Sequence, residues 1–98
     1  MLLQHIKKLI TEGEYEISSK VGGLIEEGYF ELADIESCIL TATEIYKRER
    51  DELKQSVDGY KYVIIGRDTS GLRFYSTGKM MIDYVGRYYF VITAHQAE

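Results

Sequence analysis

The sequence predicts an α+β fold in which the helices precede the strands. Apolar residues recur every three or four positions in the first half of the chain and every second position after residue 43. Glycine- and serine-containing turns separate the alternating stretches, which is typical of an antiparallel meander. We therefore expect an α-α-α-β-β-β-β order. A helical layer over about residues 2–42 packs on one face of a four-stranded, mainly antiparallel sheet over about residues 43–95, and the other face is partly wet.

Three helices are predicted in the first half. The first covers residues 2–12, where aliphatic side chains recur at helical spacing. Residues 15–17 are a short extended approach to the second helix, which begins at the hydroxyl side chain of Ser18 and ends at Gly28. The third helix follows from about Glu31, with acidic residues at its amino end, where they favour the helix dipole.

Four strands are predicted in the second half. Alternation between apolar and polar residues marks their positions, and a turn over residues 68–71 joins the second and third strands as a hairpin. Gly78 is a candidate bulge, after which residues 79–82 are a candidate extension of the third strand. The predicted strands cover residues 43–48, 60–67, 72–77 and 88–95.

The length and composition indicate one globular domain. The chain has 98 residues, 45% of them hydrophobic and 29% charged, so we expect one domain over residues 1–98. The single cysteine excludes an internal disulfide and fits a reducing compartment. No apolar run is long enough to cross a membrane, and the first residues lack the features of a signal peptide. We therefore expect a cytoplasmic protein without a membrane partner.

The net charge of −4 is unevenly distributed along the chain. Residues 1–58 hold 13 acidic and 7 basic side chains, a net of −6, whereas residues 59–98 hold 3 acidic and 5 basic side chains, a net of +2. An acidic helical layer beside a mildly basic sheet leaves room for one surface that faces phosphate. RNA therefore stays a candidate partner.

Four segments carry a resemblance to a known family: residues 15–18, 30–36, 62–67 and 90–94. Together with the turn that ends at Gly71, their order resembles the domain of unknown function 4258 family. That family is similar to the small bacterial RelE/ParE toxins. The resemblance implies a toxin-like fold, an antitoxin as a protein partner, and an activity directed at RNA or translation.

The sequence also departs from that family at positions that matter for catalysis. Relatives commonly carry histidines where this sequence has Lys20 and Tyr75, and the second helix has no basic residue over residues 21–28. The missing imidazoles favour a divergent, non-catalytic member that binds protein. The alternative is a RelE/ParE-like toxin that acts as an endoribonuclease or translation inhibitor in a toxin–antitoxin pair.

The strands offer a candidate set of catalytic residues for that alternative. Metal-independent RNA cleavage needs a proton acceptor, a proton donor and cations for the phosphate. His95 is the candidate acid or base, Arg73 or Lys61 the phosphate anchor, Tyr75 a neighbour on the strand face of Arg73, and Arg67 a further nucleic-acid-binding cation. A histidine so near a carboxy terminus is more often a solvated chain end.

Period-two alternation predicts which of these side chains share a face. On the third strand, Arg73 and Tyr75 lie on one face and Phe74 on the other. On the fourth strand, the same rule places four residues on one face, namely Tyr89, Val91, Thr93 and His95. If the solvent-exposed faces of the two strands coincide, the candidate catalytic residues lie close together.

A protein interface is predicted beside the second turn. Met80, Met81 and Tyr84 would form an apolar edge suited to a homodimer or to an antitoxin segment. If the third strand instead continues through residues 79–82, at least one of the two methionines is in the core.

No metal or cofactor is predicted. His5, His95 and Cys38 have no recognisable ligand spacing, and Cys38 is a better candidate for the core than for a nucleophile. The densest basic cluster, residues 47–50, is either a phosphate contact or a solvated strand end, and its interruption by acidic residues favours the second interpretation.

Overall fold

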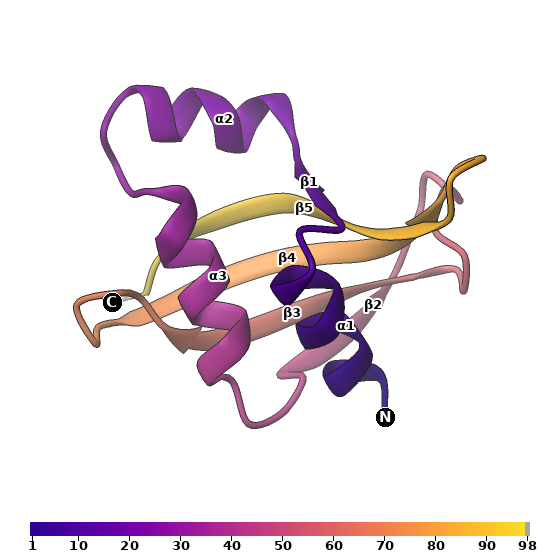
Figure 1. The fold of residues 1–98 in the computed structure, drawn as a ribbon, viewed down its shortest axis with the longest axis horizontal. Helices are drawn as coiled ribbons and strands as arrows, with labels where there is room; N and C mark the ends of the chain where they lie inside the picture. The colour runs from indigo at the N-terminus through magenta and orange to yellow at the C-terminus, as the bar shows by residue number, and fades with distance from the viewer. Residues whose placement is uncertain (98) are drawn as a thin grey trace.

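Three helices pack on one face of a five-stranded mixed sheet in the computed structural model, which describes residues 1–97 (Figure 1). The α+β class is confirmed, but the sheet has one strand more than predicted. The strand order is β1-β5-β4-β3-β2. The elements are α1 (Leu2–Thr11), β1 (Tyr15–Ile17), α2 (Ser19–Glu26), α3 (Leu32–Thr41), β2 (Lys47–Arg50), β3 (Tyr60–Arg67), β4 (Arg73–Ile82) and β5 (Arg87–Gln96).

The additional strand is β1, which the sequence predicts only as an extended approach. It pairs in parallel with β5, with Tyr15 opposite Tyr89. Ser18 then joins this strand to α2, because its hydroxyl oxygen accepts a hydrogen bond from Val21 N (3.2 Å) and donates one to Ile92 O (2.7 Å). The hydroxyl therefore caps the helix and ties it to β5.

The first strand of the predicted meander begins later than expected. Residues 43–46 form a bend and an irregular segment, and regular pairing with β3 starts at Lys47. Ile45 packs against the core although it is not in a strand. An apolar residue between polar neighbours therefore gave residues 43–46 the alternating pattern of a strand.

Helix α3 lies close to β3 because a glycine faces it. A Cβ atom on Gly66 would lie 1.9 Å from the carbonyl oxygen of Cys38. The Arg67 N–H next to this glycine donates to the Thr41 hydroxyl at 2.8 Å. At the other end of α3, the Asp34 carboxylate accepts hydrogen bonds from Glu31 N (2.9 Å) and from Thr69, so it joins the helix to the β3–β4 turn.

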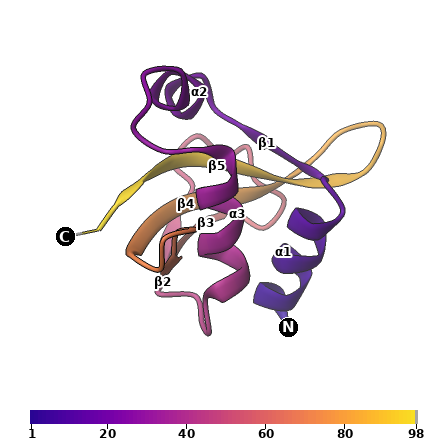
Figure 2. The same ribbon diagram turned by 60° about the vertical axis from the view of Figure 1, so that its left-hand side comes forward.

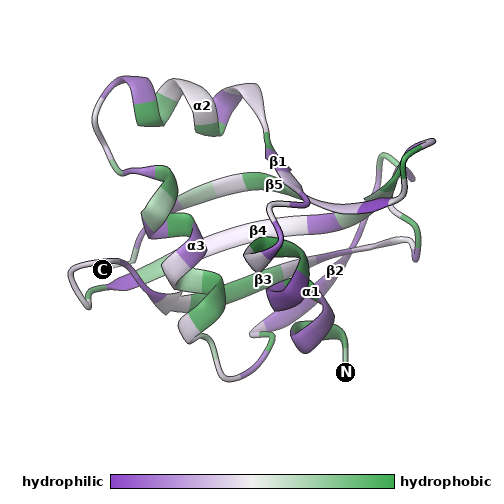
Figure 3. Ribbon diagram, viewed as in Figure 1, coloured by the Kyte–Doolittle hydropathy of each residue, from purple (hydrophilic) through white to green (hydrophobic). Residues whose placement is uncertain are grey.

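The hydrophobic core lies between the helices and one face of the sheet (Figures 2 and 3). Its largest fully buried side chain is Tyr89, and a Cβ atom on Gly78 would lie 2.4 Å from the ring of this tyrosine. The register shifts between Thr77 and Gly78, where an irregularity was predicted, but the extra residue is Ile92 of β5 and not a residue of β4. Among residues 1–97, none of the helices combines the length and the apolar character needed to cross a membrane.

The connection between β2 and β3 folds back over the sheet, and we refer to residues 51–59 as the strap. Asp51 and Lys79 form an ion pair at 3.3 Å whose side chains are each 3% exposed. The Asp51 carboxylate also accepts the N–H groups of Gln55 and Ser56. Val57 N donates to Met80 O at 2.9 Å, so the strap covers the end of β4 next to β3.

Candidate functional site

The sheet face opposite the helices is lined by apolar and small polar side chains. Strand register places Tyr75 opposite Ile65, and Thr77 opposite both Val63 and Thr93. None of the three helices in residues 1–97 packs on this side (Figure 2). We call it the open face and define its centre by six largely half-buried residues: Val63, Ile65, Tyr75, Thr77, Phe90 and Thr93.

The bulge decides which β5 side chains belong to the open face. His95 is paired with Tyr75 and lies on the open face with Thr93, whereas Tyr89 and Val91 are buried under the helices. The prediction that these four β5 residues share one face is therefore wrong. The register shift inserts one extra residue into β5 and reverses the alternation between Val91 and Thr93.

Four of the predicted site residues meet at one corner of the open face, which we call the arginine–aromatic corner: Arg67, Arg73, Tyr75 and His95. The rings of Tyr75 and His95 are 5.0 Å apart between centroids. The guanidinium of Arg73 lies 5.9 Å from the centroid of Tyr75. Arg67 is directly opposite Arg73. Neither arginine forms an ion pair within the described part of the chain.

Lys61 does not join this corner. It lies on the open face of β3, opposite Glu49, but four residues before Ile65, the partner of Tyr75. At the rise of an extended strand this separation is about 13 Å. A phosphate held by Arg73 is therefore beyond the reach expected for Lys61.

His95 has one ring nitrogen engaged and one directed away from that contact. Its Nδ1 lies 2.9 Å from the carbonyl oxygen of Gln96. Because a carbonyl only accepts hydrogen bonds, Nδ1 carries the proton in this contact and Nε2 is the nitrogen able to accept another proton. The side chain is exposed at the end of β5. Its position suits proton transfer to a ligand on the open face, next to the phenol of Tyr75.

The predicted interface residues are separated by the fold. Strand β4 continues through residues 79–82, and Met80 is 3% exposed in the core. Met81 points to the other face and is half-buried, whereas Tyr84 is 99% exposed at the tip of the β4–β5 hairpin. Only Met81 and Tyr84 are therefore accessible to a partner.

Cys38 is enclosed in the core. Its thiol donates to the Phe74 carbonyl at 3.2 Å, and the residue has no exposed surface. Burial raises the pKa of the thiol, which opposes formation of a thiolate. The side chain therefore serves packing. Across residues 1–97, no group of three metal-ligating side chains is arranged to hold an ion.

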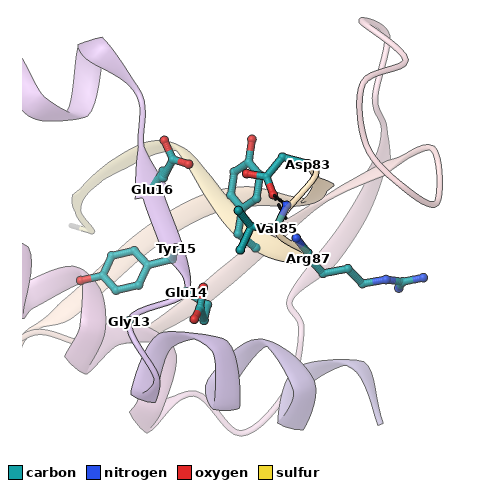
Figure 4. Close-up of a pocket in the computed structure, with 9 residues that line it drawn as sticks. Gly13, Glu14, Tyr15, Glu16, Asp83, Val85 and Arg87 are labelled. Carbon is teal, nitrogen blue, oxygen red and sulfur yellow. Dashed lines mark hydrogen bonds between the residues drawn. The ribbon is translucent and has the colours of Figure 1, made fainter.

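A second concave region lies between β1 and the β4–β5 hairpin (Figure 4). This cleft of about 320 Å³ is lined by the side chains of Glu14, Glu16 and Asp83, and the Arg87 side chain points away from them. Burial raises the pKa of the Tyr88 hydroxyl, and the charges of the nearby Glu16 and Asp83 raise it further. Sequence reasoning missed this acidic cleft, because its carboxylates come together only through the pairing of β1 with β5.

Comparisons with models of protein families, with curated proteins and with solved structures found no match. The resemblance to the domain of unknown function 4258 family and to RelE/ParE toxins therefore stays a prediction. The fold and the site define an α+β domain with one sheet face that no helix covers in residues 1–97.

Proposed function

We propose that this chain is a non-catalytic, protein-binding domain with a toxin-like fold and that its partner docks on the open face. The observation that supports this proposal is the apolar row across β3, β4 and β5. Antiparallel sheets with one solvated face commonly place polar residues there. Here the positions include Val63, Ile65, Tyr75 and Phe90. Ile65, Tyr75 and Phe90 are half-buried and no helix in residues 1–97 covers them, and apolar surface of this kind is typical of an interaction surface.

The cations of the arginine–aromatic corner favour an acidic partner at that end of the open face. Arg67 and Arg73 form no ion pair in residues 1–97, and the carboxylates that sheet register places on this face lie away from them: Glu49 is opposite Lys61, and Glu16 is opposite Phe90. Two copies of this face would bring like charges together, which disfavours a homodimer through it. An acidic segment with apolar side chains, such as an antitoxin-like protein presents, would match this face. Its apolar side chains would pack on the apolar row, and its carboxylates would pair with the arginines beside the row.

The open face can be tested by charge insertion at its centre. The adjacent gene in the genome is the first source of a partner, and its product would be titrated into the protein by calorimetry. We expect binding that the double variant Thr77→Lys, Thr93→Lys weakens by about a hundredfold, because two buried ammonium groups would lack partners. The control Glu12→Lys, on the exposed end of α1, would bind as the wild type does. Binding that survives the double substitution would contradict the proposal.

A second candidate function is RNA cleavage at the arginine–aromatic corner. The contact between His95 and Tyr75, beside two arginines without ion-pair partners, is the observation that favours it. His95 would act as the base and Tyr75 as the acid, with Arg73 on the phosphate. Under the first proposal, purified protein leaves a labelled single-stranded RNA intact. Cleavage that His95→Ala reduces by about a hundredfold or more would establish the second function instead.

A further inference from the structure

Strand β2 has a free edge whose backbone groups are unoccupied within residues 1–97. Asp51 N donates to Gly59 O at 2.9 Å, and the register then places Glu49 and Lys47 in the pairs that exchange hydrogen bonds with β3. Arg48 and Arg50 occupy the alternate positions, whose backbone groups do not bond to β3. The N–H and C=O groups of Arg48 and Arg50 therefore point away from the sheet.

The side chains of this edge carry a local excess of positive charge. Lys47 is paired with Glu49 at 3.3 Å, but Arg48 and Arg50 have no ion-pair partner in the described residues. The guanidinium of Arg48 lies 4.2 Å from the centroid of the Tyr60 ring, which holds it in place. The strand is hydrophilic along its whole length (Figure 3).

Short, charged edge strands normally prevent association with other sheets. The charge on β2 is mainly positive. It therefore repels a basic strand, attracts an acidic strand and offers a neutral strand no electrostatic attraction. We propose that the β2 edge binds an extended acidic segment of a protein partner by strand addition, with hydrogen bonds to Arg48 and Arg50. Because this edge is separate from the open face, the proposal is independent of the proposed function.

The opposite edge of the sheet discriminates against the same ligand. Tyr89 N donates to Glu14 O, and Ser18 N donates to Val91 O, so the backbone groups of Tyr15 and Ile17 point outward from β1. This edge borders the acidic cleft. An acidic strand is therefore repelled at β1 and attracted at β2, although both edges offer unpaired backbone groups.

Amide hydrogen exchange measured by NMR tests this proposal on the full chain. The probe is the peptide acetyl-Glu-Val-Glu-Val-Glu-amide, with its lysine counterpart as a control. We expect the amides of Arg48 and Arg50 to exchange rapidly in the free protein and to slow by about tenfold with the acidic peptide. The amides of Tyr15 and Ile17 stay unchanged. Equal protection at both edges, or none at β2, would overturn the proposal.

Two variants of one residue separate backbone pairing from simple charge attraction. Arg50→Pro removes an outward N–H without removing a bond to β3, whereas Arg50→Gln removes the charge and keeps the N–H. We expect the proline variant to lose at least about tenfold in peptide affinity and the glutamine variant about threefold. Equal losses in the two variants would show a purely ionic contact and overturn strand addition. Slow exchange of the Glu49 and Asp51 amides, which bond to β3, would show that the pairing of β2 with β3 is intact in both variants.

Two further outcomes are decisive. The Thr77→Lys, Thr93→Lys variant is expected to bind the peptide as the wild type does, so failure of the open-face proposal leaves this one standing. Slow exchange at Arg48 and Arg50 in the concentrated free protein, lost on dilution, would mean that a second copy occupies the edge. That result would overturn the choice of an acidic partner.

Discussion

Lys79 shows how strongly a single residue depends on its surroundings. It lies on the open face of β4, yet the strap covers it, and its ammonium donates to the Asp51 carboxylate and to Gln55 Oε1 (2.9 Å). Burial by itself would raise the pKa of the Asp51 carboxyl. The hydrogen bonds from Ser56 N, Gln55 N and Lys79 outweigh burial and lower it. The Asp51 side chain is therefore held as a carboxylate in the folded protein.

This pair makes stability depend on pH in a defined direction. Because the pKa of Asp51 is lower in the folded than in the unfolded chain, its carboxylate adds stability above the ordinary value of about 3.9. The contribution is lost as the pH falls through the lowered folded value. We expect urea denaturation to show a falling free energy of unfolding below about pH 4, and Asp51→Asn to reduce this slope. The control Gln55→Ala removes a bond without removing a titrating group, so its slope should match the wild type.

Breaking the pair from the other side should be more costly at neutral pH. Lys79→Met leaves a buried carboxylate with only backbone donors, and we expect a loss of about 3–5 kcal/mol in unfolding free energy. The double variant Asp51→Asn, Lys79→Met removes both charges and should recover part of that loss. Additive losses in a double-mutant cycle would contradict a coupled pair.

At the scale of elements, the approach of α3 to β3 is set by one glycine. Gly66→Ala would place a methyl group 1.9 Å from the backbone oxygen of Cys38, and backbone cannot move aside as a flexible side chain does. We expect a loss of about 3 kcal/mol or more in chemical denaturation, together with shifted NMR signals in α3.

Helix α2 provides the matched glycine control. A Cβ atom on Gly23 would meet nothing within 4 Å, so Gly23→Ala should stabilise the protein by about 0.5–1 kcal/mol through helix propensity. A similar loss for both alanine variants would contradict close packing at Gly66 as the cause.

The junction between β1 and α2 depends on one hydroxyl group. Ser18→Ala removes the helix cap and the bond to Ile92 O together, and we expect a loss of about 1–2 kcal/mol in unfolding free energy. Ser19→Ala is the control, because Ser19 is exposed and already inside the helix. Equal effects at the two positions would mean that neither the helix cap nor the bond to Ile92 O contributes to stability.

At the scale of the molecule, one core unites the helical layer and the sheet. Residues from α1, α3 and three strands belong to the same buried cluster, with Ile6, Ile39 and Tyr89 among its members. We therefore expect helix content and tyrosine fluorescence to report a single coincident urea transition. Two separated transitions would contradict the single domain that the length and composition predict.

Local patterns were sufficient to predict the three helices and the β3–β4 hairpin. Each depends on residues near one another in the chain, such as the turn at residues 68–71, where Asp68 accepts the N–H groups of Ser70 and Leu72. The placement of β1 was out of reach, because its three residues show no periodicity and its partner lies at the far end of the chain. The prediction that His95 and Tyr89 share a face was wrong because the extra residue in β5 interrupts the strict alternation of side chains.

The sequence by itself determined the α+β class, the order of the main elements and the residue types of the arginine–aromatic corner. These follow from periodicity and composition, which act over a few residues at a time. Tertiary structure decided that Lys61 stands apart from Arg73, that Met80 is core, and that Arg48 and Arg50 present a free edge. Strand register and helix coverage are long-range choices. They depend on which apolar surfaces find each other, and local residue patterns do not encode that choice.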